Sequence, residues 1–264
     1  MGRDIIKIFK YEVLDILHSR WLIFYTLFFL LLTEGLFRLG GGVTKTSMSM
    51  MNVVIIVVPL FCIILGSMYL YNSKEFIQLL LTQPIQRSSL FWGIYLGLSI
   101  PLVISFSVGM GIPYLVHAFR SGQSISSFWA LLGNGILLTF IFVGISYLVA
   151  ILFDDRIRGL AMVIGLWLFF AVIYDGLVLF LIYTFSDYPL EKPIIGFTIF
   201  NPIDLARILL LLKFDISALM SYTGAVFEQF FGSILGSSLS LSALGLWIII
   251  PLTAALRKFK HKDF

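Results

Sequence analysis

Long apolar stretches separated by short polar segments run along the whole chain. Six of them are long enough to cross a hydrocarbon core of about 30 Å as an α-helix, which takes roughly 20 residues. These predicted spans cover about 21–38, 50–71, 90–116, 128–153, 160–184 and 233–256. The pattern predicts an all-α, polytopic membrane protein in which residues 1–264 form a single transmembrane domain.

The segment before the first span has a helical pattern of another kind. Its apolar residues fall on one face of a helix, which is typical of a helix lying in the headgroup plane. The apolar face comprises Ile5, Ile6, Phe9, Val13, Ile16 and Leu17, and the polar face comprises Arg3, Asp4, Lys7, Asp15 and His18. We expect an interfacial helix over residues 3–18, and the alternative is a plain extension of the first span.

The composition excludes a soluble domain. Mean hydropathy is +1.02, and charged residues make up 12% of the chain, which is about half of what a soluble domain carries. The basic balance, with a pI near 9.1, reflects membrane topology and anionic lipid rather than nucleic acid, because no basic surface is interleaved with aromatic residues.

An even number of spans places both termini on one side of the membrane, and lysine and arginine favour the cytoplasmic side. With both termini inside, the inner segments hold 12 of these residues and the outer segments hold 6. The inner set is Arg3, Lys7, Lys10, Arg20, Lys74, Arg87, Arg156, Arg158, Arg257, Lys258, Lys260 and Lys262. We therefore expect both termini in the cytoplasm.

The inner segment 72–89, between spans two and three, contains a short apolar run. Phe76–Leu81 is flanked by Lys74 and Glu75, and Gln83-Pro84 should end a helix there because the residue before proline avoids the helical region. An apolar helix in this position suggests a surface that a cytosolic partner covers. The alternative is a helix that lies on the inner leaflet.

The outer segment 185–232 is the longest polar stretch. We expect a loop through Asp187, Pro189, Glu191, Lys192 and Pro193. A helix should then run from Pro202 to about Leu212, because Asn201 is a good N-cap, Pro202 suits the first helical position and Asp204 lies near the positive helix end. A second apolar segment follows over 214–227. Both are too short to span, and they are predicted to be re-entrant or interfacial helices.

The chain offers few groups for catalysis. Its three histidines are unpaired in sequence, and no nucleophile elbow or zinc-ligand motif is present. Charges near lipid are the best functional candidates. Glu34 and Arg38 can pair at a four-residue spacing or line an exit path, and Asp175 can face a cavity or a subunit interface.

Two further patterns remain open. The thioethers of Met48, Met50 and Met51, at the outer start of span two, are soft ligands that suit Cu(I), although packing is the commoner use of such residues. Gly93-x-x-x-Gly97 allows close helix contact.

The whole chain resembles an ABC-2 type permease, the membrane subunit of ABC exporters of the type V architecture. That family has an interfacial N-terminal helix, a coupling helix between spans two and three, and two short re-entrant helices between spans five and six. The resemblance implies that an ATPase subunit docks at Lys74, Glu75, Leu79, Leu80, Gln83, Pro84 and Arg87.

Within the family, Asn201-Pro202-Ile203-Asp204-Leu205-Ala206-Arg207, followed by Asp215-Ile216-Ser217, looks like the NosY group, which serves the maturation of nitrous oxide reductase. The resemblance implies that Asn201, Pro202, Asp204, Arg207 and Asp215 form a gate or contact a periplasmic partner. It also implies a link to the copper site.

The sequence thus leads us to expect a homodimeric permease half in a bacterial inner membrane. We expect no catalytic residue, metal or cofactor in this chain, with ATP and Mg²⁺ bound by a separate ATPase chain. Three rivals stay open: a general ABC-2 exporter of a lipid, drug or peptide, an intramembrane enzyme, and a secondary transporter, which would need inverted repeats.

Overall fold

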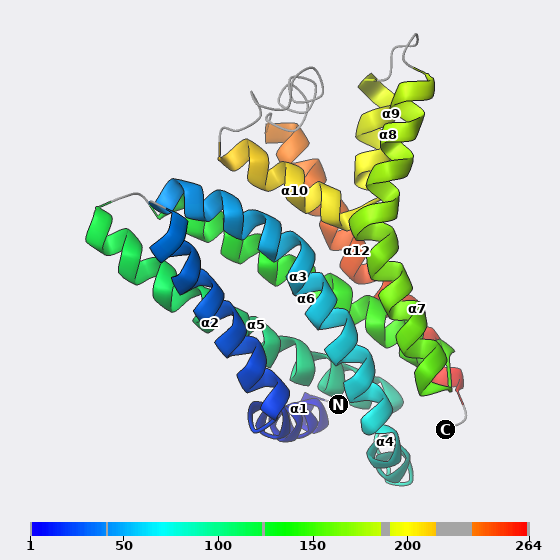
Figure 1. Ribbon diagram of the computed structural model, residues 1–264. Helices are drawn as coiled ribbons and strands as arrows, with labels where there is room; N and C mark the ends of the chain where they lie inside the picture. Colours follow the sequence, from blue (N-terminus) through cyan, green and yellow to red (C-terminus); the bar gives the residue numbers. More distant parts are fainter. Residues whose placement is uncertain (1, 41, 123–124, 186–190, 215–233, 263–264) are drawn as a thin grey trace.

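The computed structural model describes residues 2–40, 42–122, 125–185, 191–214 and 234–262, and in these ranges every regular element is a helix (Figure 1). The helices are α1 (Gly2–Leu17), α2 (Arg20–Gly40), α3 (Val43–Asn72), α4 (Lys74–Leu81), α5 (Arg87–Ser121), α6 (Ser126–Leu152), α7 (Arg156–Leu168), the π-helix η1 (Phe169–Ile173), α8 (Tyr174–Thr184), α9 (Glu191–Ile199), α10 (Pro202–Lys213) and α12 (Ile234–His261).

Six helical stretches in the described ranges are long and apolar enough to cross a membrane. They are α2, α3, α5, α6, the continuous run α7–η1–α8, and α12. The predicted all-α fold with six spans is therefore confirmed. Several helices continue beyond the apolar stretch that predicted them, and α5 ends only where Gly122 adopts the left-handed conformation (φ 63°) that terminates many helices.

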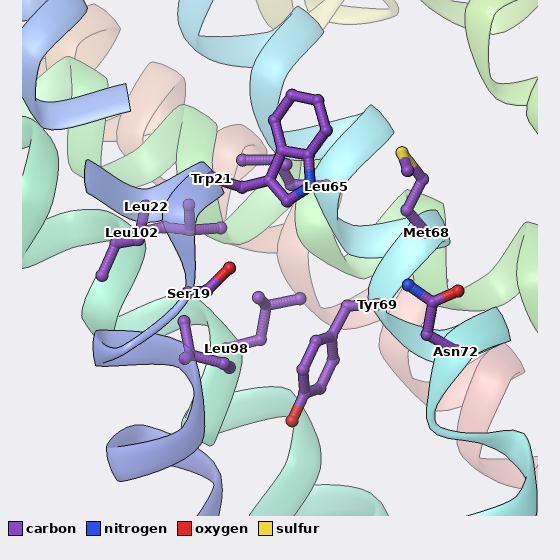
Figure 2. Close-up of a pocket in the computed structure, with 10 residues that line it drawn as sticks. Ser19, Trp21, Leu22, Leu65, Met68, Tyr69, Asn72, Leu98 and Leu102 are labelled. Carbon is purple, nitrogen blue, oxygen red and sulfur yellow. The ribbon is translucent and has the colours of Figure 1, made fainter. Parts of the chain in front are cut away.

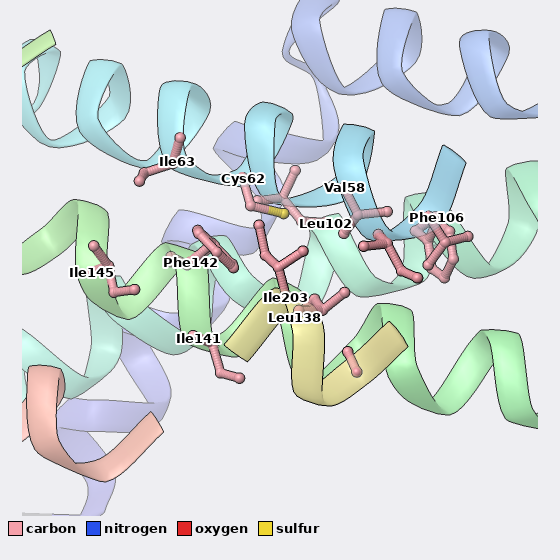
Figure 3. Close-up of a cluster of buried hydrophobic side chains, with 14 of the residues drawn as sticks. Val58, Cys62, Ile63, Leu102, Phe106, Leu138, Ile141, Phe142, Ile145 and Ile203 are labelled. Carbon is pink, nitrogen blue, oxygen red and sulfur yellow. The ribbon is translucent and has the colours of Figure 1, made fainter. Parts of the chain in front are cut away.

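The centre of the bundle is formed by α3 and α6, which pack along each other and are flanked by α5 and α12. Figure 3 shows this core, where Val58 and Cys62 of α3 lie against Leu138 and Phe142 of α6. All four side chains are fully buried. Span five, in contrast, buries few residues in the described chain, because α7 and α8 stand at one side of the bundle (Figure 1).

Both chain termini lie at the same end of the bundle, which we call the terminal end (Figure 1). Helices α1 and α4 lie at this end, whereas the connection from α2 to α3 lies at the opposite, far end. Placement of the two termini on one side agrees with the even number of spans.

Helix α1 packs on α5 at the predicted small-residue motif. A Cβ atom added to Gly93 would come 2.7 Å from Ile8 Cγ2, and one added to Gly97 would come 2.5 Å from Glu12 Cβ. The two glycines therefore let α1 and α5 approach closely, as in other membrane helix pairs. The close contact predicted at Gly93 and Gly97 is found, and its partner is α1.

The buried stripe of α1 differs in part from the predicted apolar face. Ile8, Glu12 and Ile16 are buried, whereas Ile6 and Leu17 are 64% and 43% exposed. The face that packs on α5 is thus rotated from the one predicted, because the closest approach is set by the glycines of α5 rather than by the most apolar side of α1.

Two short helices, α9 and α10, lie between spans five and six and meet at a bend of 110°. The predicted helix at Pro202 is found as α10. The expected loop is wrong at Glu191, Lys192 and Pro193, because these residues begin α9, and proline is compatible with the first turn of a helix. Its other residues, Asp187 and Pro189, lie outside the described residues. The second predicted apolar helix, over 214–227, lies almost entirely outside the described residues.

Candidate functional site

Helix α4 presents a mixed surface at the terminal end. Ile77 is 1% exposed and holds α4 against the bundle, whereas Leu79 is 58% exposed. Glu75 and the turn residues Gln83 and Pro84 are also exposed. These four positions of the predicted ATPase contact are available to another protein, while Leu80 packs partly against the core.

The two basic residues of the predicted contact instead bind within the chain. Arg87 Nη1 donates to the carbonyl oxygens of Lys260 and Lys262 at 2.9 and 2.8 Å, so it holds the end of α12. Lys74 Nζ donates to Asp154 Oδ1 at 3.3 Å, in the connection between α6 and α7. Lys74 and Arg87 were predicted to contact a partner. In the structure, their side chains bind carboxylate and carbonyl oxygens of the same chain instead.

Asp154 is the meeting point of these contacts. Lys262 Nζ lies 2.7 Å from Asp154 Oδ1, opposite the contact from Lys74. Hydrogen bonds from Lys262 and then Lys74 lower the pKa of this carboxyl group from its usual value. The start of α4, the α6–α7 connection and the end of the chain therefore form one ionic network.

A second set of contacts joins α4 to α1. The rings of Tyr11 and Phe76 stack with centroids 5.2 Å apart. The hydroxyl of Tyr69, near the end of α3, donates to Glu12 Oε2. A displacement of α4 would thus act on α1 and, through Lys74, on the α6–α7 connection.

Glu12 is a functional candidate that the sequence analysis missed. It is 1% exposed, and its burial, with a smaller contribution from Asp15, raises the pKa of the carboxyl group to about 7. The spacing Ile8–Glu12–Ile16 places an acid in the middle of a helical stripe, and this signal could have identified it from the sequence.

The other polar cluster lies where α9 meets α10 and where span five contains its π-helix. Asn201 caps α10 by accepting a hydrogen bond from the Ile203 amide at 3.0 Å. Its Nδ2 group donates to the Phe170 carbonyl oxygen, in η1, at 2.9 Å. The π-helix departs from the regular α-helical bonding pattern, and Asn201 bonds a backbone oxygen of this segment.

Arg207 joins the same cluster from the next turn of α10. Its Nη1 atom lies 2.7 Å from Asp175 Oδ2 and 2.9 Å from Asp204 Oδ1. Asp204 Oδ2 also accepts from Asn201 Nδ2 at 2.8 Å. We call Asn201, Asp204, Arg207 and Asp175 the break cluster, since they join the break between α9 and α10 to span five at and just after its π-helix.

Asn201 and the two residues that follow it are buried, whereas the other members of the break cluster are partly exposed, with side-chain exposures of 15% for Asp204, 26% for Arg207 and 32% for Asp175. Asn201 and Ile203 are 0% exposed, Pro202 is buried, and Figure 3 shows Ile203 pointing into the core between α3 and α6. A direct contact of Asn201 or Pro202 with a periplasmic partner is therefore incompatible with this arrangement. Asp215, the last predicted member, lies outside the described residues. Asp175 proves to contact Arg207 of the same chain.

The charges near the far end form a local network. Arg38 Nε lies 2.8 Å from Glu34 Oε1, and His117 Nε2 lies 3.0 Å from Glu34 Oε2. The ring of His117 also stacks on Phe37 with centroids 4.5 Å apart. The local ion pair, one of the two interpretations of Glu34 and Arg38, is thus present and joins α2 to α5.

The methionines at the start of α3 pack into the protein. Met50 is 0% and Met51 6% exposed, and Met50 Sδ accepts a hydrogen bond from the Thr33 hydroxyl at 3.7 Å. Met48 is only partly buried. In the described ranges, no group of three histidine, cysteine or acidic side chains is arranged to hold a metal ion.

Comparison with known proteins places this architecture in a family. A sequence model of the ABC-2 family transporter proteins matches residues 41–264. The chain is 28% identical over 259 residues to the probable ABC transporter permease protein NosY of Pseudomonas aeruginosa, with 92% of this chain and 90% of that protein covered. It is 25% identical over 266 residues to the probable ABC transporter permease protein NosY of Stutzerimonas stutzeri, with 95% and 89% covered. The chain belongs to the ABC-2 family of transporter proteins, as a multi-pass permease subunit.

Proposed function

We propose that this permease converts ATP hydrolysis on a separate ATPase chain into movement of its own helices. The observation that carries the proposal is α4, a short helix at the terminal end with Leu79 exposed and with side-chain links to α1 and the α6–α7 connection. Glu75, Gln83 and Pro84 are exposed together with Leu79, so this side of α4 is free for another protein to cover. ATP and Mg²⁺ would be bound by the partner chain.

The proposed orientation places the terminal end in the cytoplasm of a bacterial inner membrane. The distribution of lysine and arginine supports it, with 12 on the terminal side in the predicted topology and 6 on the other. We further infer that two copies of the chain form the permease. The exposed apolar side chains of span five, including Leu168 of α7, Val172 of η1 and Phe180 of α8, supply surface for a second copy or for lipid.

The contacts between helices suggest how a movement driven by the ATPase would pass through the permease. Closure of the ATPase would push α4, which acts on α1 through Tyr11 and on the α6–α7 connection through Asp154. Helix α7 continues through η1 into α8, where Asp175 binds Arg207 of α10. A movement of span five would therefore reach the α9–α10 pair through the break cluster.

Leu79→Asp is expected to weaken the binding of the ATPase at least about tenfold, because it removes an exposed leucine worth roughly 1.5–3 kcal/mol when buried and adds a charge. The measurement is recovery of the ATPase with the tagged permease across a range of ATPase concentrations. Leu39→Asp is the matched control, since Leu39 is 89% exposed on α2 at the far end. Equal recovery with both variants would contradict docking at α4.

We infer that the transporter serves the maturation of nitrous oxide reductase. Support comes from the two relatives named NosY, which align over nearly the whole chain, although at 25–28% identity. In this hypothesis, the α9–α10 pair passes the movement to a periplasmic partner that takes part in building the copper site. The contact would involve surfaces other than the buried side chains of Asn201 and Pro202.

Complementation distinguishes this role from that of a general exporter of lipid, drug or peptide. In a denitrifying strain that lacks its NosY, this chain and its own ATPase are expected to restore nitrous oxide reduction and the copper absorption of the reductase. Arg207→Ala should reduce the rescue, because it removes the ion pair between span five and α10, and Arg38→Ala should preserve it. A well-expressed pair that restores neither activity nor copper absorption would favour the general exporter.

A further inference from the structure

An acidic cavity lies at the terminal end between α1, the end of α3 and the start of α4. Its volume is about 520 Å³, and its lining includes Glu12, Asp15 and His18 but, among the residues that the structure describes, no lysine or arginine. Ser19, Asn72 and Ser73 add hydroxyl and amide groups to the lining. The proposed function uses neither this cavity nor its two carboxylates.

Glu12 is fixed in the wall of this cavity with one oxygen unsatisfied. Its Cβ atom lies over Gly97, where an added methyl group would come within 2.5 Å, so the first part of the side chain is held against α5. Oε2 accepts a hydrogen bond from Tyr69, whereas Oε1 is buried without a hydrogen-bond partner in the described chain. A buried carboxylate oxygen without a donor is costly, and a ligand that donates hydrogen bonds would remove the cost.

A smaller apolar pocket of about 90 Å³ adjoins the acidic cavity, and Figure 2 shows its lining. Its apolar lining includes Trp21, Leu65, Leu98 and Leu102. The two spaces share four lining residues, namely Ile16, Ser19, Tyr69 and Asn72. A polar, negatively charged space therefore continues into an apolar one at the edge of the bundle.

We propose that this cavity binds a primary ammonium group against Glu12, carried by an amphipathic molecule whose apolar part occupies the adjoining pocket. An ammonium group has three N–H donors, which can serve Glu12 Oε1 and nearby hydroxyl or amide oxygens. The rings of Tyr11 and Phe76, which also line the cavity, are suited to a cation. A bare metal ion fits poorly, since the space is large and the described residues offer no three-ligand group.

The source that suits both spaces is an aminophospholipid such as phosphatidylethanolamine. In the orientation of the proposed function, the cavity opens at the level of the inner headgroups, where this lipid is within reach. A soluble amine has the same ammonium group but no apolar part that would occupy the adjoining pocket. The same ammonium group can thus come from lipid or from solution, and the two sources are separable by experiment.

A ligand in this cavity would contact α1, α3 and α4, and in the proposed function α4 is the helix that the ATPase moves. Its lining comes from α1, α3 and α4 together, including Tyr11 and Phe76, whose stacked rings join α1 to α4. This consequence rests on the proposed function. The binding itself does not, because it can be measured on the permease purified without any ATPase.

The test uses native mass spectrometry of the full-length permease released from nanodiscs that contain equal amounts of phosphatidylethanolamine and phosphatidylcholine. The two lipids differ in the headgroup nitrogen, which is a hydrogen-bond donor only in the first. Wild-type protein is expected to retain phosphatidylethanolamine at least tenfold over phosphatidylcholine. Glu12→Gln, which keeps the shape of the side chain and the acceptor for Tyr69, should abolish this preference.

Two further variants and one further probe make the result decisive. Asp15→Asn should reduce the preference in part, and Glu34→Gln, which changes an acid at the far end, should leave it intact. Ethanolamine added to lipid-depleted permease tests the soluble source: binding that depends on Glu12, without lipid preference, would confirm the ammonium site and assign it to a soluble amine. Equal retention of both lipids by the wild type with no ethanolamine binding would overturn the proposal, as would a preference that survives in Glu12→Gln.

Discussion

Replacing Arg207 by alanine is expected to lower the free energy of unfolding by about 2 kcal/mol, because it leaves the partly buried carboxyl groups of Asp175 and Asp204 without their cation. Arg207 Nη1 contacts Asp175 at 2.7 Å and Asp204 at 2.9 Å, and all three side chains are at most about a third exposed. Chemical unfolding of the detergent-solubilised permease, followed by circular dichroism, measures the loss. The break between α9 and α10 should loosen first, because this ion pair connects it to span five.

The control for this prediction is the exposed ion pair at the far end. Arg38, 75% exposed, contacts Glu34 at 2.8 Å, and Arg38→Ala should cost less than about 1 kcal/mol, as surface pairs do. The neutral combination of Asp175→Asn, Asp204→Asn and Arg207→Met should recover at least half of the loss, since removal of a whole buried ionic group is tolerated better than removal of one partner. A cost for Arg207→Ala as small as that of Arg38→Ala would show that water screens the break cluster.

The stability of the permease is also expected to fall as the pH rises from about 5 to 8, with Glu12 responsible for about 3 kcal/mol of the change. Burial raises the pKa of its carboxyl group from 4.5 to about 7. The folded protein therefore binds the proton more tightly than the unfolded chain, and this stabilisation is complete below pH 4.5. It disappears as the pH passes the folded pKa near 7.

Denaturant unfolding at a series of pH values, in detergent free of amines and lipid, measures this dependence. Glu12→Gln should be more stable than the wild type at pH 8 and should lose the part of the slope that Glu12 supplies. Glu75→Gln, a change of the same type at an exposed position, should retain the slope of the wild type. A slope that is equal in Glu12→Gln and the wild type would show that other groups cause it.

The sequence predicted the features of the fold that are determined by residues close to one another in the chain. Asn201 and Pro202 begin α10 because an amide cap and a fixed φ angle act within one helical turn. The six spans follow from apolar length alone. The motif at Gly93 and Gly97 correctly indicated a close helix contact. In each case, the information lies within a few residues of the feature that it predicts.

The candidate site was predicted less well because its contacts join distant parts of the chain. Arg87 holds backbone oxygens at Lys260 and Lys262, and a bond to carbonyl oxygens leaves no trace in the sequence of the partner. Asp175 and Arg207 are 32 residues apart, and they meet only because α9 and α10 fold back on span five. Glu12 was overlooked because an acid in an interfacial helix ordinarily faces water.

The π-helix in span five also affects how this span tolerates a change of length. Each residue turns the chain by less in a π-helix than in an α-helix, so the five residues of Phe169–Ile173 cover about the same rotation as four α-helical residues. Removing one residue from this segment would therefore restore regular α-helical bonding and leave Asp175 facing Arg207. Relatives that lack one residue in η1 should thus retain both Asp175 and Arg207.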